Sequence, residues 1–522
     1  MLRPDFYPQP VNVVELRQTH TSYVFLAGDL VYKVKKPVRF PFIDCSDLHK
    51  RRVFCFDEVR LNSRFSPRVY LGVHAIFKRG DRFSLGPSVA RGHPKAVEYA
   101  VKMVRLPDDR MLDHLVVEHR VVAGAIRSLA TRIAQFHAGA ATSRAQTYGS
   151  SDALWRSISG ELAEDAEFIG RTLERSQFIA IETFCRSFIA SHRQLLDARV
   201  SQGRVREGHG DLRAEHISIS DGRIEVIDCV EFSERLRYGD VASEIAFLAM
   251  DLERLEAAEL ADELVEAYAE VTNDEELPML MPFYKCYRAC VRGKVESLRS
   301  LEPEVGSGER QRSRGLARRY FALAYRYACV GSPALIVVCG LSGTGKSTLA
   351  RALQHRTGFR ILSSDRVRKR LTGIALHERL RSAYKTGVYS EAFSRVVYGT
   401  MLAEAENLLK DGCGVILDAT FKASADRLKA REIAAKLKMP VLFVECVASR
   451  AEAIRRIERR AELALGEVSD ATAEVYELQR AEFERICEIP ARNHLVVDTT
   501  RARDVVLREV ERALVRLRPR AL

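Results

Sequence analysis

The first hundred residues alternate between apolar and polar positions in short runs that are typical of β-strands. Residues 21–26 are rich in β-branched and aromatic side chains, a Gly-Asp turn follows, and residues 30–35 alternate with a period of two. These two segments predict a pair of antiparallel strands. The same period places Lys33 and Lys35 on one face of the second strand.

Helical patterns become more frequent in the next part of the chain. We expect a helix at about 46–65, which contains Glu58, and further strands at about 68–104. Pro107 stops the last strand because it has no N–H for a sheet ladder. A long helical stretch at about 152–198 follows. A β-rich start before a helical body predicts an α+β unit with two lobes.

From residue 334 onward, apolar strands alternate with helical stretches, which favours an α/β domain with a parallel sheet and right-handed crossovers. A segment at 302–308 that contains proline and glycine, and a further helix, precede this part. The sequence therefore predicts two domains, 1–330 and 331–522. The expected strands of the second domain are 334–339, 360–364, 414–418, 440–447 and 494–498.

The composition is that of an ordinary globular protein, with 47% hydrophobic and 29% charged residues. No apolar run is long enough to predict a membrane span and no export signal opens the chain, so we expect a cytoplasmic protein without a membrane partner. The eleven cysteines include no C-x-x-C pair, which favours free thiols. Most of the net charge of +12 lies after residue 331, where a basic face could contact phosphates or simply face solvent.

The strongest chemical signal follows the apolar segment 334–339. The next eight residues fit G-x-x-x-x-G-K-[ST] at every fixed position and lead into a helix. In such a loop, backbone N–H groups and the helix N-terminus surround a phosphate, the lysine reaches the β- and γ-phosphates, and the hydroxyl serves Mg²⁺. The expected nucleotide-binding residues are Gly340, Leu341, Ser342, Gly343, Thr344, Gly345, Lys346, Ser347 and Thr348.

Two carboxylates follow later strands of this domain. Asp365 can accept the proton of a substrate hydroxyl while Arg368 binds a neighbouring anionic group, although Asp365 could also cap the next helix. Asp418 ends an apolar strand, where it could serve Mg²⁺ as a Walker B carboxylate or help to hold the substrate. We expect both side chains at the carboxyl edge of the sheet.

A basic helical stretch lies further along the chain, and its arginines recur with a spacing of four. Such a helix could close over ATP and neutralise charge as the γ-phosphoryl group moves. Arg455 and Arg459 share one helical face, and we expect them to stabilise the transferred charge; Arg456 and Arg460 share another.

The first domain has a chemical stretch of its own at 208–228. A loop that carries Asp211, a short strand, an Asp-Gly turn and a second strand can bring Asp211 and Asp228 together at the ends of a hairpin. Phosphoryl transfer uses one carboxylate to take or orient the proton of the acceptor and another to hold metal against the phosphates.

This stretch resembles the aminoglycoside-phosphotransferase and protein-kinase-like group, whose loop reads H-G-D-x-x-x-x-N with an Asp some dozen residues later. The resemblance covers about 10–300 and implies that Asp211 is the catalytic base and Asp228 a Mg²⁺ ligand. It also implies that Lys33, or else Lys35, holds the phosphates of ATP and that Glu58 pairs with it. Residues 103–106 would lie beside adenine.

The sequence departs from that pattern at two places. His216 stands where the pattern has Asn, and we count it among the metal-site positions although imidazole is a poor ligand for Mg²⁺. The phosphate-covering turn near residues 19–22 has no glycine. A first domain that binds a nucleotide without catalysing transfer is therefore an alternative to an active kinase.

The second domain, over about 333–515, resembles small P-loop kinases of the gluconate-kinase, polynucleotide-kinase and zeta-toxin group. The whole chain is then similar to a bacterial fusion of a kinase-like α+β domain with an α/β P-loop NTPase domain. That resemblance implies an ATP-dependent phosphotransferase that uses Mg²⁺ and moves the γ-phosphate to a hydroxyl, with a small-molecule acceptor favoured. A kinase of 5′-hydroxyl nucleic-acid ends and a non-catalytic ATP-binding regulator are the alternatives. The sequence indicates no oligomeric state.

Overall fold

The computed structural model divides the chain into two compact units, the first made of residues 1–154 and 195–274 and the second of residues 155–194 and 275–522. The predicted boundary near residue 330 is not tested by this division and stays a prediction. The described residues are 1–19, 21–40, 43–80, 82–143, 148–303, 305–374, 387–462 and 472–518.

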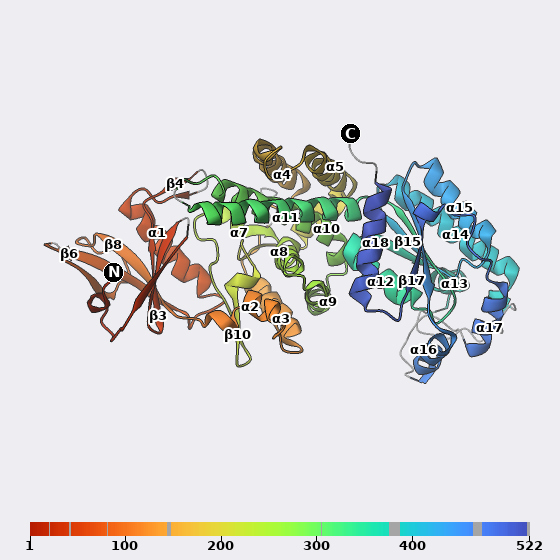
Figure 1. Ribbon diagram of the computed structural model, residues 1–522, viewed down its shortest axis with the longest axis horizontal. Coiled ribbons are helices and arrows are strands. Elements are labelled where there is room, and N and C mark those ends of the chain that lie inside the picture. Colours follow the sequence, from red (N-terminus) through yellow and green to blue (C-terminus); the bar gives the residue numbers. More distant parts are fainter. Residues whose placement is uncertain are drawn as a thin grey trace. The chain divides into compact units, whose positions relative to one another are not determined.

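The first unit opens with a six-stranded antiparallel sheet in the order β1-β2-β3-β8-β6-β7, which confirms the predicted strand pairs. Helix α1 (Leu48–Asn62) lies against β6 and β8 (Figure 1). Asp47 caps this helix by accepting a hydrogen bond from the backbone N–H of Lys50. Its strands are β1 (Val14–Gln18), β2 (Ser22–Ala27), β3 (Leu30–Lys35), β6 (Tyr70–Arg79), β7 (Arg82–Ser88) and β8 (Glu98–Val104), and β4 (Arg39–Phe40) and β5 (Ile43–Asp44) form a separate antiparallel pair.

The second lobe of this unit is mainly helical and carries the predicted hairpin. Strands β10 (Ile217–Ser220) and β11 (Arg223–Val226) pair antiparallel, with Asp221 and Gly222 in left-handed conformation at the turn. The remaining elements are α2 (Leu112–Val117), α3 (Ala125–Gly139), α6 (Arg193–Ser201), β9 (Val205–Glu207), α7 (Glu234–Arg237), β12 (Tyr238–Asp240), α8 (Val241–Arg254) and α9 (Ala258–Thr272).

The second unit contains a five-stranded parallel sheet in the order β14-β15-β13-β16-β17, as predicted. Alternate residues of the central strand enter two cores, so that Val337 packs on one side of the sheet and Val338 on the other. Helices cover both faces (Figure 1). The strands are β13 (Leu335–Cys339), β14 (Arg360–Ser363), β15 (Val415–Asp418), β16 (Val441–Val447) and β17 (His494–Asp498).

Helices α12 (Lys346–Thr357) and α18 (Arg503–Leu517) contribute to one core, and α14 (Glu391–Lys410) and α15 (Ser424–Lys436) to the other. Earlier helices pack onto the same unit, and Gly358 at the end of α12 lies so close to the backbone of Met279 that a Cβ would approach its carbonyl oxygen to 2.7 Å. The other helices of this unit are α4 (Ser151–Asp165), α5 (Arg175–Ser191), α10 (Leu277–Arg299), α11 (Ser307–Gly331), α13 (Ser364–Thr372), α16 (Arg450–Glu462) and α17 (Ala473–Glu482).

Two expectations from composition can be compared with the structure. All eleven cysteines fall within the described ranges and carry free thiols, and Cys339 and Cys446 are buried in sheet strands as predicted. Among the helices that the structure describes, none combines the length and the apolar character needed to cross a bilayer.

Candidate phosphoryl-transfer sites

The glycine loop between β13 and α12 has a geometry that needs its glycines. Gly340, Gly343 and Gly345 all have positive φ angles, which side chains rarely adopt. A Cβ on Gly343 would lie 2.4 Å from the carbonyl oxygen of Ala453, and one on Gly340 would lie equally close to the carbonyl oxygen of Cys446. The backbone therefore folds tightly just before α12, whose N-terminus can attract an anion.

Lys346 and Ser347 occupy the first turn of α12, and Asp418 ends the neighbouring strand β15. The Ser347 hydroxyl lies close enough to the Asp418 carboxylate to favour its charged form. The Lys346 ammonium donates to the Leu341 carbonyl oxygen at 2.8 Å. Burial lowers the pKa of Lys346, although Asp418 acts in the opposite direction, and burial raises the pKa of Asp418. The hydroxyl and carboxylate oxygens are the ligand type that Mg²⁺ prefers, so this pair fits the ion.

Asp365 and Arg368 both lie on α13, which follows β14, but Ser363 takes the N-cap position, so the alternative that Asp365 caps this helix is wrong. Asp365 follows the carboxyl end of β14, the edge of the parallel sheet where the glycine loop lies, and its charge opposes the lowering of the Lys346 pKa by burial. Arg368 is 6% exposed; it donates to the Val388 carbonyl oxygen at 2.5 Å and its guanidinium lies 4.8 Å from the ring centroid of Tyr389. Its Nε has no hydrogen-bond partner. A buried guanidinium with a spare donor is suited to an anionic group.

The arginine of α16 that lies nearest the glycine loop is not one of the two expected to stabilise transferred charge. Arg455 is exposed and pairs with Glu452 one turn earlier, and Arg459 is also exposed. Arg456 instead donates to the Thr499 hydroxyl at 2.9 Å, and a Cβ on Gly345 would lie 3.3 Å from its guanidinium. The roles of Arg455 and Arg459 therefore stay predictions, and Arg456 joins the candidate site.

In the first unit, the predicted lysine, glutamate and aspartate come together around β3. The Lys33 ammonium lies 2.9 Å from Glu58 of α1 and also contacts Asp228, which follows β11. Burial by itself lowers the pKa of Lys33, but Asp228 and Glu58 raise it well above its usual value. Asp228 has a φ of 67°, a left-handed conformation that is uncommon for a residue with a side chain. The strained backbone turns its carboxylate toward Lys33.

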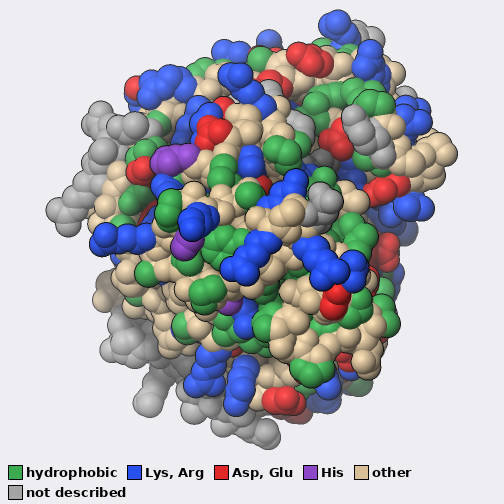
Figure 2. Space-filling model, turned by 90° about the vertical axis from the view of Figure 1, so that its left-hand side faces the viewer, with side chains coloured by type: hydrophobic (Ala, Val, Ile, Leu, Met, Phe, Trp, Pro, Cys, Tyr) green, Lys and Arg blue, Asp and Glu red, His purple; other side chains and the backbone are tan. Residues whose placement is uncertain are grey.

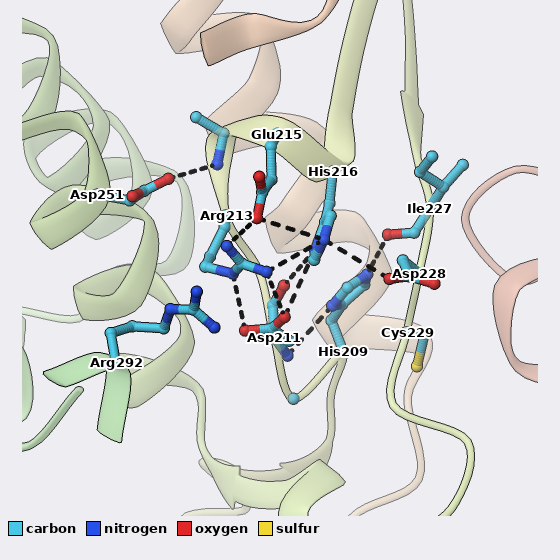
Figure 3. A network of polar contacts seen from close by, with 12 residues as sticks. His209, Asp211, Arg213, Glu215, His216, Ile227, Asp228, Cys229, Asp251 and Arg292 are labelled. Carbon is cyan, nitrogen blue, oxygen red and sulfur yellow. Dashed lines mark hydrogen bonds and ion pairs between the residues drawn. The ribbon is translucent and has the colours of Figure 1, made fainter. Parts of the chain in front are cut away.

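The predicted base Asp211 is held by neighbours on its own loop (Figure 3). Arg213 donates to both carboxylate oxygens of Asp211 at 2.9 Å and also contacts Glu215. The Nδ1 atom of His216 lies 2.9 Å from the Asp211 carbonyl oxygen, and its Nε2 lies 3.3 Å from Arg213 and 3.7 Å from Asp228. Both ring nitrogens of His216 therefore have protein neighbours, and its role as a metal ligand stays a prediction.

Helix α8 supports this loop through a residue that the sequence did not single out. Glu244 accepts a hydrogen bond from the backbone N–H of Gly210 at 2.5 Å and lies 2.8 Å from the Nε2 of His137. Burial tends to raise the pKa of Glu244, but His137 and the other partners hold it at about 2. His137 is buried, with a side chain that is 2% exposed. Glu244 is not part of any sequence motif, because its partners Gly210 and His137 lie 34 and 107 residues away in the sequence.

Two further expectations concern the Mg²⁺ sites and the basic surface. Among the residues that the structure describes, no group of three or more His, Cys, Asp or Glu side chains is arranged to hold a metal ion, so Mg²⁺ at either site would need ligands from the nucleotide or water. On the face that Figure 2 shows, lysine and arginine side chains are scattered among acidic and apolar ones. The view is from the N-terminal side of Figure 1, so the expected basic face after residue 331 stays a prediction.

Two family models match the chain. The model described as the phosphotransferase enzyme family matches residues 99–280, and the model described as an AAA domain matches residues 335–486. Uncharacterized proteins of Mycobacterium tuberculosis (strain ATCC 25618 / H37Rv) and Mycobacterium bovis (strain ATCC BAA-935 / AF2122/97) are each 34% identical to the chain over 465 residues, which is 88% of this chain and 88% of each relative.

Solved structures of lower identity also align with each part of the chain. A gluconokinase from Sinorhizobium meliloti 1021 is 22% identical, and the alignment covers 35% of this chain and 93% of that protein with a TM-score of 0.26. A choline/ethanolamine kinase family protein from Mesorhizobium loti is 15% identical, with 60% of this chain and 92% of that protein covered and a TM-score of 0.36.

Proposed function

The chain belongs to the family of these mycobacterial proteins, and because it matches a phosphotransferase-family model at 99–280 and an AAA-domain model at 335–486, we propose that it is an ATP-dependent kinase of a small molecule. The γ-phosphoryl group of ATP would pass to a hydroxyl of the acceptor. The observation that carries this proposal is the arrangement of Lys346, Ser347 and Asp418 under the glycine loop.

In the proposed reaction, the loop amides and Lys346 hold the phosphates of ATP. Ser347 and Asp418 would hold Mg²⁺, which neutralises phosphate charge when it is bound. Asp365, on the phosphate side of the sheet, accepts the proton of the acceptor hydroxyl, and Arg368 binds an anionic group of the acceptor. Arg456 stands beside the loop, where its charge can stabilise the moving phosphoryl group.

The first domain is proposed as a second nucleotide site. Lys33 and Asp228 would separate as the phosphates and a metal ion arrive, and Asp211 would act as base once an acceptor displaces Arg213. A cytoplasmic location, where ATP is available, stays a prediction.

The test is transfer of radiolabelled γ-phosphate from ATP, with Mg²⁺ or Mn²⁺, into sugars, aminoglycosides, nucleosides and 5′-hydroxyl oligonucleotides. Lys346→Ala should abolish transfer by the P-loop domain and Asp211→Ala transfer by the first domain, whereas Lys429→Ala, a surface control on α15, should leave both intact. Labelled oligonucleotides would favour the nucleic-acid alternative. ATP binding without any labelled acceptor would contradict the kinase proposal and favour the regulator.

A further inference from the structure

The buried charges around β3 extend beyond the lysine and glutamate that phosphate binding needs. Lys35, two residues after Lys33, places its ammonium 2.5 Å from Glu58, and it also contacts Glu231. Glu58 therefore gives one carboxylate oxygen to each lysine. The result is a chain of five alternating charges in the order Asp228, Lys33, Glu58, Lys35, Glu231.

Burial distinguishes the two ends of this chain of charges. The side chains of Lys35 and Glu58 are 1% and 0% exposed, and that of Glu231 is 7% exposed. The Asp228 side chain is 43% exposed. A nucleotide can therefore reach Asp228 from solvent, with the buried Lys33 directly behind it, whereas Lys35 and Glu231 lie further inside. Lys35 and Glu231, which we call the inner pair, therefore have a different role from the outer pair, Asp228 and Lys33.

Chain connectivity shows what the inner pair holds together. Glu231 comes three residues after Asp228, so its ion pair with Lys35 ties the segment that carries Asp228 to strand β3. Lys35 also fixes the second oxygen of Glu58, so the carboxylate cannot turn away from Lys33. If Lys33 leaves Asp228 to bind a phosphate, Glu58 and the strand remain in place.

We propose that Lys35 and Glu231 are a positioning pair, which holds Glu58 and the Asp228 segment so that Lys33 can exchange Asp228 for a nucleotide phosphate. This inference rests on the proposed nucleotide site of the first domain. Neither residue of the pair touches the nucleotide. The pair acts through the orientation of Lys33 and Asp228.

The decisive variant is Glu231→Gln, because it leaves Lys35 in place and removes only its anchor. Burial raises the pKa of Glu231 although Lys35 lowers it, so a neutral amide of the same shape should be tolerated. A positioning role predicts that nucleotide affinity falls about tenfold, which corresponds to about 1.4 kcal/mol, without a matching fall in the melting temperature. Direct contact of Lys35 with the nucleotide predicts unchanged or tighter binding, since its ammonium would be released.

The double variant Lys35→Met/Glu231→Gln separates positioning from stability. It removes one buried charge of each sign, so the net charge of the cluster is unchanged, whereas Lys35→Met alone leaves Glu231 buried without its partner and should unfold most easily. We expect the double variant to melt near the parent chain and still to bind nucleotide about tenfold more weakly. Parent-like affinity in this variant would overturn the proposal.

Binding is measured with a fluorescent ATP analogue and Mg²⁺ on the full chain carrying Lys346→Ala, so that the signal reports the first domain. Lys33→Met in the same chain sets the baseline, and Lys78→Met and Glu234→Gln, both at exposed residues, are the matched controls. If the parent Lys346→Ala chain binds no nucleotide above that baseline, the positioning role is rejected. Transfer by the P-loop domain, measured with Lys346 intact, would still stand.

Discussion

The two candidate sites present opposite charges to a nucleotide. In the first domain, five carboxylates, those of Glu58, Asp211, Glu215, Asp228 and Glu231, are paired with the three cations Lys33, Lys35 and Arg213. In the P-loop domain, the two carboxylates of Asp418 and Asp365 are outnumbered by the cations Lys346, Arg351 and Arg366. The first site is a network of ion pairs that a ligand must open. The second is the tightly folded backbone of the glycine loop at 340–347, which we call the backbone cradle, with cations around it.

The largest expected effect tests the backbone cradle. Gly343→Ala places a Cβ at a φ of 77° and 2.4 Å from a backbone carbonyl, so the strain and the clash together should weaken nucleotide binding at the P-loop about 10³-fold. Fluorescent-nucleotide titration of a chain with Lys33→Met measures this. Gly399→Ala, inside α14 with open space around it, is the control and should leave binding unchanged. A Gly343→Ala chain with parent affinity would show that the loop does not hold phosphate.

A buried carboxylate on α8, beside the ion-pair network, should make the first unit sensitive to acid. Glu244 has a pKa of about 2 in the folded chain, below the usual value of 4.5, so it contributes about 3 kcal/mol that is present above pH 4.5 and lost as the pH falls toward 2. Glu244→Gln should therefore lower stability at pH 7 and have little effect near pH 2. Hydrogen exchange of α3 and α8 against pH measures it, and an equal loss at both pH values would contradict the assignment.

A buried carboxyl gives the second unit the opposite pH dependence. Asp165 at the end of α4 is 0% exposed, neither of its oxygens has a hydrogen-bond partner, and burial raises its pKa well above the usual range. Its neighbours are Glu161 and Glu164, which raise the pKa further, and Lys294, which lowers it. Stability is therefore full below pH 3.8 and falls as the pH rises, by about 1.4 kcal/mol for each unit of the shift.

Asp165→Asn should remove this dependence and raise the stability of the second unit at pH 7. The only tryptophan of the chain, Trp155, lies on the same helix, so its fluorescence during urea unfolding follows this unit. Asp152→Asn, at an exposed residue of α4, is the control. A variant that keeps the pH dependence of the parent chain would place its cause elsewhere.

Local patterns predicted the P-loop site far better than the ion-pair network. The glycine loop, Lys346 and Ser347 are contiguous, so eight residues were enough to predict the tight glycine loop and the start of α12. The two lysines of β3 were placed on one face by the strand period, but Glu231 contacts Lys35 across 196 positions of sequence. Only the fold brings such residues together. Arg213 lies only two residues from Asp211, yet the contact between them depends on a side-chain rotamer that no spacing determines.

Removal of divalent cations should distinguish the two sites, with a smaller effect on nucleotide affinity than the Gly343→Ala substitution. Without a metal ion, the excess of carboxylates in the first site repels the phosphates of ATP, while the cations of the P-loop site still attract them. EDTA should therefore weaken nucleotide binding at least about tenfold more in the Lys346→Ala chain than in the Lys33→Met chain. Equal losses would contradict the charge difference between the sites.

The smallest expected effect distinguishes the arginines of α16. Ala453 and Ile457 are buried and fix the rotation of this helix, which turns Arg456 toward Thr499 and the loop and leaves Arg455 exposed beside Glu452. Arg456→Ala should weaken nucleotide binding or slow transfer several-fold, since the lost charge lies beside Gly345. Arg455→Ala should change either quantity less than twofold, because an exposed pair contributes at most about 1 kcal/mol to stability and lies away from the loop. Comparable losses in kcat from both variants would mean that α16 turns or closes during the reaction, and would return Arg455 and Arg459 to the site.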